Sequence, residues 1–183
     1  MKVGRTLYLH RVADWRAWLR KHHRTRREIW LVYYRKASGK PRISYNDSVD
    51  EALCFGWIDS QAAKLDADRF AQRFTPRRAG SPVSEMNRAR ARRLVREKRM
   101  TQAGLDAIGS LRAARLVVPP DIKAALQRDP LAWKHFQRFP AAYRRMRVAF
   151  VDGARRRPAE FARRLTHLVR RSAKNERYGM IRE

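Results

Sequence analysis

The chain has 183 residues, and its 44 % of hydrophobic and 10 % of aromatic residues exclude intrinsic disorder and predict a self-sufficient fold. Lys and Arg number 44 against 17 Asp and Glu, which gives a formal net charge of +27. This charge exceeds what solubility requires and makes nucleic acid or another polyanion a candidate partner. An arginine bias can instead reflect the base composition of the source genome, so both interpretations of the charge stay open.

The sequence also favours one cellular compartment. No apolar run approaches the roughly 18 residues that span a bilayer, and residues 1–11 carry charges where a signal peptide needs an apolar stretch. The single cysteine, Cys54, cannot form an internal disulfide and excludes a cysteine-based zinc cluster. We therefore expect a cytoplasmic protein without membrane contact, whose oligomeric state the sequence does not predict.

Helix and strand patterns alternate in the first part of the chain. Their spacing and turn residues predict the boundaries of each element. In chain order, the first predicted elements are a helix capped by Asp14, a buried strand at 29–34 and a short helix from Ser44 to Gly56. A hairpin of two strands, 57–65 and 70–75, follows. The next two elements are a helix that begins at Ser81 and Pro82 and runs to about Lys98, and a helix capped by Thr101.

The pattern becomes wholly helical beyond about residue 117. Four helices are predicted there, at 121–127, 130–139, 141–151 and 158–173. The predicted fold class is therefore α+β: a small, mainly antiparallel sheet packed by helices, followed by a C-terminal helical module. The chain is predicted to divide into an α+β N-terminal region at 1–116 and a helical C-terminal module at 117–183. The alternative is that both parts form one compact unit.

A basic stripe is predicted on the helix that follows Pro82. Helical spacing places four arginines on one narrow face, namely Arg88, Arg92, Arg96 and Arg99. Such a stripe is a candidate polyanion-binding surface, although a charge run is more typical of a solvated face. No helix-turn-helix, zinc-finger or RNA-recognition signature accompanies it, so base-specific recognition is not predicted.

Several stretches together form a specific signature. They are ALCFGWIDS at 52–60, TPRR at 75–78, the Ser- and Asn-bearing segment 81–87, RMTQAG at 99–104, and VPPD at 118–121. The chain resembles the bacterial YdeI/OmpD-associated family over nearly its whole length. Val83 departs from the tryptophan usual in relatives, and 155–160 matches a C-terminal family element only loosely.

The resemblance implies an α+β build with a helical C-terminal module and leaves the biochemical activity unassigned. The family name suggests bacteriocin protection or an outer-membrane porin partner. Direct contact with a porin would need an export signal, which we do not find in this sequence.

The signature also suggests a candidate ligand pocket. An anion or planar polar ligand could be held by a helix N-terminus, arginine side chains and a tryptophan face. The candidate residues are Trp57, Asp59, Arg73, Arg77, Arg78, Ser84 and Asn87. The competing interpretation is structural: Asp59 pairs with an arginine and fastens the hairpin to a helix, while Trp57 packs in the core.

Evidence for catalysis is thin. The five histidines lack metal-binding spacing, Cys54 lies in an apolar run, and no nucleotide-binding or nucleophile motif is present. We assign no catalytic residue, metal or cofactor. The favoured hypothesis is a non-enzymatic basic protein that contacts polyanions such as nucleic acid; the alternative is a small-anion-binding protein or enzyme with a pocket around Trp57, Asp59, Arg77 and Asn87.

Overall fold

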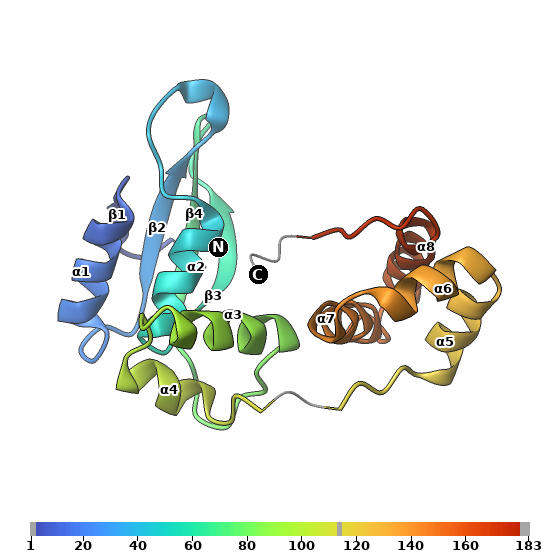
Figure 1. The fold of residues 1–183 in the computed structure, drawn as a ribbon. Helices are drawn as coiled ribbons and strands as arrows, with labels where there is room; N and C mark the ends of the chain where they lie inside the picture. The colour runs from blue at the N-terminus through green and yellow to red at the C-terminus, as the bar shows by residue number, and fades with distance from the viewer. Residues whose placement is uncertain (1–2, 113–114, 180–183) are drawn as a thin grey trace. The chain divides into compact units, whose positions relative to one another are not determined.

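The computed structural model of the chain describes residues 3–112 and 115–179. In this part of the chain, four strands and eight α-helices form two compact units (Figure 1). The N-terminal unit comprises the chain up to Val83 together with Arg90–Leu111, and the C-terminal unit comprises Ser84–Ala89 and the chain from Arg112 onward. The predicted α+β class is confirmed, because a mixed, mostly antiparallel sheet accompanies the helices.

The sheet of the N-terminal unit has the strand order β1-β2-β4-β3. The predicted strand and hairpin are confirmed: β4 pairs antiparallel with both β2 and β3. Strand β1, which was not predicted, pairs parallel with β2, and helix α1 connects the two strands. The bounds are Thr6–Tyr8 for β1, Val12–His22 for α1, Ile29–Tyr34 for β2, Trp57–Lys64 for β3 and Arg69–Pro76 for β4.

One face of the sheet is covered by helices, because alternate residues of each strand point to the same side. Ile29, Leu31 and Tyr33 of β2 pack with Trp15 and Leu19 of α1 in the larger core of this unit. Helix α2 (Tyr45–Cys54) adds Val49 and Leu53 to the same core. The opposite face carries a small second cluster of Trp30, Val32 and Ala71.

The helix starts test the sequence predictions. Ser44 caps α2 as predicted, and Thr101 caps α4 (Gln102–Ile108). Two predicted starts were wrong: α1 begins at Val12, with Asp14 in its first turn, and α3 is Glu85–Arg96 instead of starting at Ser81. A short 3-10 turn, Lys36–Ser38, lies between β2 and α2.

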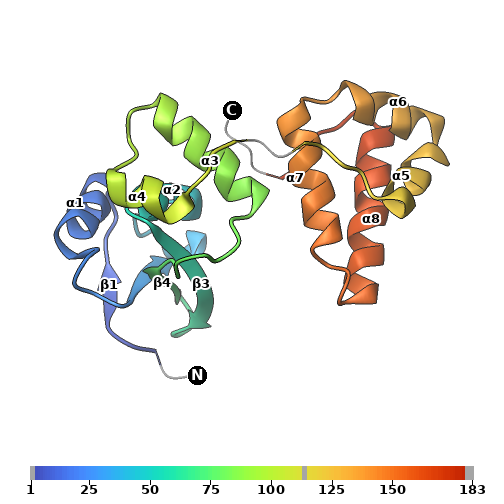
Figure 2. The ribbon, with the colours of Figure 1, turned by 90° about the horizontal axis from the view of Figure 1, so that it is seen from below.

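The C-terminal unit consists mainly of four helices, as predicted for this part of the sequence. They are α5 (Pro120–Gln127), α6 (Pro130–Arg138), α7 (Ala141–Asp152) and α8 (Pro158–Ala173). Figure 2 shows α7 and α8 running side by side. The core of this unit includes Leu126, Phe136, Tyr143, Val151 and Leu168. None of the helices in the described ranges combines the length and apolarity that a bilayer crossing requires.

Candidate functional site

A buried carboxylate on α2 organises the arginines of α3. Asp50 is 1 % exposed, and its Oδ1 lies 2.7 Å from Nη1 of Arg90. Its second oxygen accepts from Arg93, which also pairs with Glu97 at 2.8 Å. Arg90 donates in addition to the side-chain oxygen of Asn46 at 2.6 Å. These contacts connect α3 to α2. Removing one partner would leave an uncompensated buried charge, so the connection is costly to break.

The neighbouring carboxylate forms a second cluster. Glu51 is 2 % exposed and accepts from Nη1 of Arg16 and Nη2 of Arg99, each at 2.6 Å. Arg16 also donates to the backbone carbonyl of Arg99 at 2.9 Å. Glu51 therefore joins α1, α2 and the chain that follows α3. Asp50 was absent from the sequence-based candidates because its partners lie about 40 residues away.

The predicted stripe is divided by these contacts. Arg99 lies beyond the end of α3, after Lys98, which has a φ of 55°. Its guanidinium donates a hydrogen bond to Glu51. Arg92 donates to the backbone carbonyl of Leu111 at 3.1 Å. Arg88 has a buried Nε, and of the four arginines only Arg96 is exposed, the others being partly buried. The four arginines therefore do not form one free stripe on one helix.

The predicted pocket residues bond mainly with partners outside their own set. Trp57 is 1 % exposed and donates from Nε1 to the carbonyl of His23 at 3.1 Å. Asp59 accepts from the Tyr45 hydroxyl at 2.5 Å, and burial together with this carboxylate raises the pKa of Tyr45. Trp57 thus packs in the core, as the competing structural interpretation expected, whereas the hydrogen bond of Asp59 goes to a tyrosine instead of an arginine.

Strand register separates Arg73 from these two residues. Asp59 is paired with Phe74, so both lie on the helix-covered face, and Arg73 lies on the opposite face. There Arg73 donates from Nε to Glu28 at 2.8 Å. The pocket candidates Asp59 and Arg73 therefore lie on opposite faces of the sheet.

The remaining pocket candidates shape the loop before α3. Arg77 donates from Nη2 to the Ser81 and Pro82 carbonyls at 3.3 and 3.1 Å, and burial lowers its pKa. These contacts keep the two carbonyls out of a helix, which explains why α3 starts late. The Ser84 hydroxyl accepts from the Asn87 N–H at 3.2 Å as a local cap, and Arg78 is exposed.

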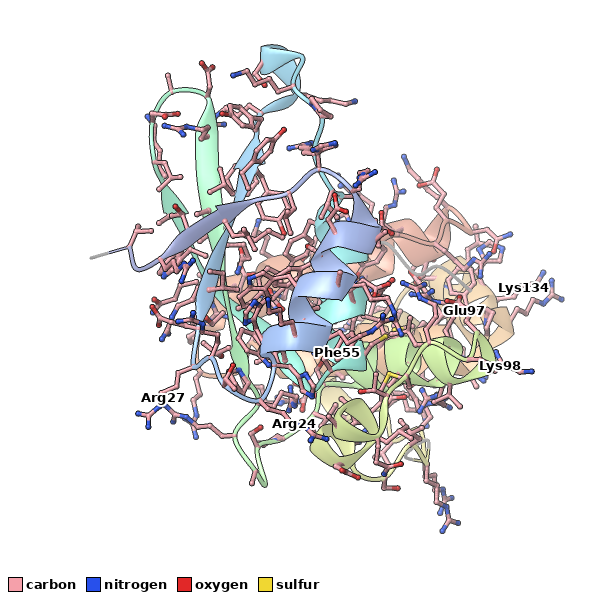
Figure 3. All side chains as sticks on the ribbon, turned by 90° about the vertical axis from the view of Figure 1, so that its left-hand side faces the viewer. Arg24, Arg27, Phe55, Glu97, Lys98 and Lys134 are labelled. Atoms are coloured by element: carbon pink, nitrogen blue, oxygen red, sulfur yellow. The ribbon has the colours of Figure 1, made fainter. Side chains whose placement is uncertain are left out.

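A cationic surface that the sequence analysis passed over follows α1. We define the α1–β2 basic segment as Arg20, Lys21, Arg24, Arg26 and Arg27, all of which are exposed. No carboxylate within the described residues forms an ion pair with any of them. Figure 3 shows Arg24 near the end of α1 and Arg27 projecting away from the ribbon. The local run of cations at 20–27 was the available signal in the sequence.

The segment has a defined backbone. The N–H groups of Thr25 and Arg26 both donate to the carbonyl of His22, at 3.1 and 2.9 Å. The Trp57 indole bonds the next carbonyl, that of His23, and so fastens the turn to the core. Burial lowers the pKa of His22, and the charges of Lys21, Arg26 and Arg5 lower it further. The segment is therefore an ordered region of positive potential.

The described residues contain neither an exposed cysteine nor a cluster of metal-ligand side chains. Cys54 is fully buried, and burial raises the pKa of its thiol to about 11, so the thiolate nucleophile is suppressed. Among residues 3–112 and 115–179, no three His, Cys, Asp or Glu side chains are grouped so that they could hold a metal ion.

Comparisons with known proteins assign the two parts of the chain to families. Residues 7–107 match the model described as Domain of unknown function (DUF8412). This matched range contains most of the signature stretches found in the sequence. Residues 115–175 match the model described as Bacteriocin-protection, YdeI or OmpD-Associated, which confirms the predicted resemblance for this part. No curated protein and no solved structure matches the chain. Because the first match covers more than half of the chain, the protein belongs to the DUF8412 family, and its residues 115–175 are similar to the YdeI/OmpD-associated family.

Proposed function

We propose that the protein binds nucleic acid through contacts between the α1–β2 basic segment and the phosphate backbone. The observation that carries the proposal is five exposed cations, within eight consecutive residues, that no described carboxylate neutralises. Contacts of this kind release condensed counterions and do not read base sequence. The proposed activity is therefore binding that is indifferent to sequence and sensitive to salt.

The distribution of acidic groups supports this assignment. In the N-terminal unit, Asp50, Glu51 and Glu28 each pair with arginines of other elements. Asp14 and Asp66 pair with arginines three residues away. Since these carboxylates are engaged elsewhere, the segment keeps its positive charge available for an external polyanion.

The turn geometry also supports it. Binding orders both the backbone and the side chains of a contact segment, and each costs conformational entropy. Because the backbone of this segment is already fixed, only the side chains remain to be ordered on binding. Arg20 and Lys21 lie in the last turn of α1, where the helix dipole favours positive charge. The hydrogen bond from Trp57 to His23 holds the middle of the segment in place.

Fluorescence anisotropy of labelled mixed-sequence duplex DNA tests the proposal with the nuclease-treated full chain. If all five cations contact phosphates, they contribute about −4.5 to the slope of log affinity against log salt. A variant with Arg20, Lys21, Arg24, Arg26 and Arg27 all changed to Gln should bind weakly, with a slope less negative by about that amount.

A charge-matched control separates a site from bulk charge. The control changes five other exposed cations of the same unit to Gln, namely Arg35, Lys36, Lys64, Arg78 and Lys98. We expect the control to retain most of the affinity and slope of the wild type. Equal losses in both variants, or no binding by the wild type at low salt, would contradict the proposal.

A further inference from the structure

A groove on the C-terminal unit has no role in the proposed function. Its volume is about 530 Å³, and residues of α5, of α8 and of the turn between α5 and α6 line it. Helices α5 and α8 pack against each other, as Figure 2 shows. The lining residues Thr166, Arg170 and Lys174 are exposed, so the groove is open to solvent.

The floor of this groove is apolar, and we define it as Leu165, Val169, Ala173 and Ala125. The first three follow one another at four-residue spacing on α8 and so share one face of that helix. At about 1.5 Å per residue, the row from Leu165 to Ala173 is about 12 Å long. All four side chains are only partly buried, so a partner that covers them would remove more apolar surface from water.

The rim of the groove is cationic, and we define it as Arg128, Arg170 and Lys174. Arg170 and Lys174 each follow a floor residue of α8 by one position, whereas Arg128 comes directly after the last residue of α5. All three are exposed, and none forms an ion pair with a carboxylate of the described residues. Positive charge therefore lies on both sides of the apolar row.

One carboxylate lines the groove together with these cations. Asp129 caps α6, and its Oδ1 accepts from the N–H groups of Leu131 and Ala132, both at 3.0 Å. Because one carboxylate faces three cations, the lining carries a net positive charge.

Charge complementarity selects the occupant of such a groove. A second copy of the chain would bring a net charge of +27 to a cationic rim, and mutual repulsion opposes this contact. A nucleic-acid duplex presents its phosphate backbone, which would satisfy the rim but leave the apolar floor uncovered. A peptide that carries both acidic and apolar side chains satisfies the rim and the floor together.

We propose that this groove binds an acidic amphipathic helix of a partner protein. Apolar side chains of the helix at i, i+4 and i+8 would lie along the row from Leu165 to Ala173, since that row has the same spacing. Carboxylates on the two flanks of the helix would face Arg128 on one side and Arg170 and Lys174 on the other. The inference is independent of nucleic-acid binding, because it uses residues of the other unit.

Fluorescence anisotropy of the full chain with labelled synthetic peptides tests the proposal. The main probe is a helix of about 14 residues, with leucine at i, i+4 and i+8 and glutamate on both flanks. One matched probe replaces the leucines by serine and keeps every charge; another replaces the glutamates by lysine. We expect saturable binding of the main probe, binding of the serine probe weaker by about tenfold or more, and no binding of the lysine probe.

Two charge-matched variants locate the binding. The rim variant, Arg128→Gln, Arg170→Gln and Lys174→Gln, should weaken binding of the main probe by about tenfold. The control changes one lysine and two arginines that are exposed on the same unit and do not line the groove to Gln, namely Lys123, Arg138 and Arg156. We expect the control to change the affinity by less than about twofold, because screening weakens distant charges. Since all six side chains are exposed, both variants should fold like the wild type.

One further variant keeps this test separate from that of nucleic-acid binding. The variant that lacks the five cations of the α1–β2 basic segment should bind the main probe like the wild type. A loss of peptide binding in that variant would show that the probe reports net charge, and would overturn the proposal. Displacement of the probe from the same variant by duplex DNA would assign the groove to nucleic acid and overturn it as well.

The remaining contrary outcomes also overturn the proposal. They are no saturable binding of the main probe, equal affinity for the leucine and serine probes, and equal losses in the rim and control variants. Sedimentation velocity covers the last alternative: a dimer that dissociates in the rim variant would assign the groove to a second copy of the chain.

Discussion

Two buried arginines show how the two units accommodate a charge away from water. Arg93 in the N-terminal unit is 8 % exposed and pairs with Asp50 and Glu97. Arg147 in the C-terminal unit is 3 % exposed and is surrounded by aromatic rings instead of carboxylates. The first arrangement is complete and fastens helices together. The second leaves Nε and Nη2 of Arg147 without a hydrogen-bond partner among the described residues.

The largest expected effect is at the carboxylate of the complete arrangement. Asp50→Asn keeps the side-chain shape but leaves Arg90 without a compensating charge and Arg93 with Glu97 as its carboxylate partner. We expect it to destabilise the N-terminal unit by about 3–5 kcal/mol. Hydrogen exchange followed by mass spectrometry measures this for each unit separately. Unchanged protection in α2 and α3 would show that the ion pairs do not fasten these helices.

The next effect compares the two arginines directly. Arg93→Met leaves one oxygen of buried Asp50 without its partner and should destabilise the N-terminal unit by about 1.5–3 kcal/mol. Arg147→Met removes a buried charge that has no described carboxylate partner, so the C-terminal unit should be unaffected or stabilised. The measurement is again unit-resolved hydrogen exchange. Destabilisation by both substitutions to the same extent would end the distinction between the two environments.

A smaller effect concerns pH. The pKa of His167 is lowered in the folded protein, so the unfolded chain binds the proton first as the pH falls. The stability of the C-terminal unit should therefore be full above about pH 6.5 and should decrease below it. His167→Gln should flatten this dependence in thermal unfolding between about pH 8 and pH 5.5. An identical slope in the variant would assign the pH dependence to other groups.

The smallest effect is expected at an exposed ion pair. Arg155 contacts both oxygens of Asp121 at 2.9 Å, which lowers the pKa of Asp121. Both side chains are almost half exposed, so water and salt screen the attraction. Asp121→Asn should leave the unfolding midpoint in urea close to that of the wild type. A large shift would show that exposure is a poor guide to the value of an ion pair in this protein.

Local signals in the sequence were sufficient for much of the fold. Ser44 and Thr101 fixed two helix starts because a cap depends on residues two or three positions away. β1 escaped prediction because a three-residue strand with exposed ends has no hydrophobic pattern of its own. The start of α3 was misplaced because the Ser81 and Pro82 carbonyls bind Arg77, a contact that no helix-start rule contains.

The candidate sites depended on pairings that periodicity does not encode. Asp50 and Arg93 are 43 residues apart in the chain, so a helical stripe cannot reveal which of its arginines meets a carboxylate. Arg73 was grouped with Trp57 by proximity, but the register of β3 and β4 places it on the other face of the sheet. The basic run at 20–27 needed only local information, yet its exposure became visible only in the folded chain.

The arrangement around Asp50 also restricts how the chain can diverge. Arg90 reaches Asp50 and Asn46 with two different nitrogens, and Arg93 reaches Asp50 and Glu97 in the same way. A lysine has one compact ammonium group and cannot reproduce two such contacts in fixed directions. Related sequences that keep Asp50 should therefore keep arginine at both positions, whereas the α1–β2 basic segment can exchange arginine for lysine and retain its charge.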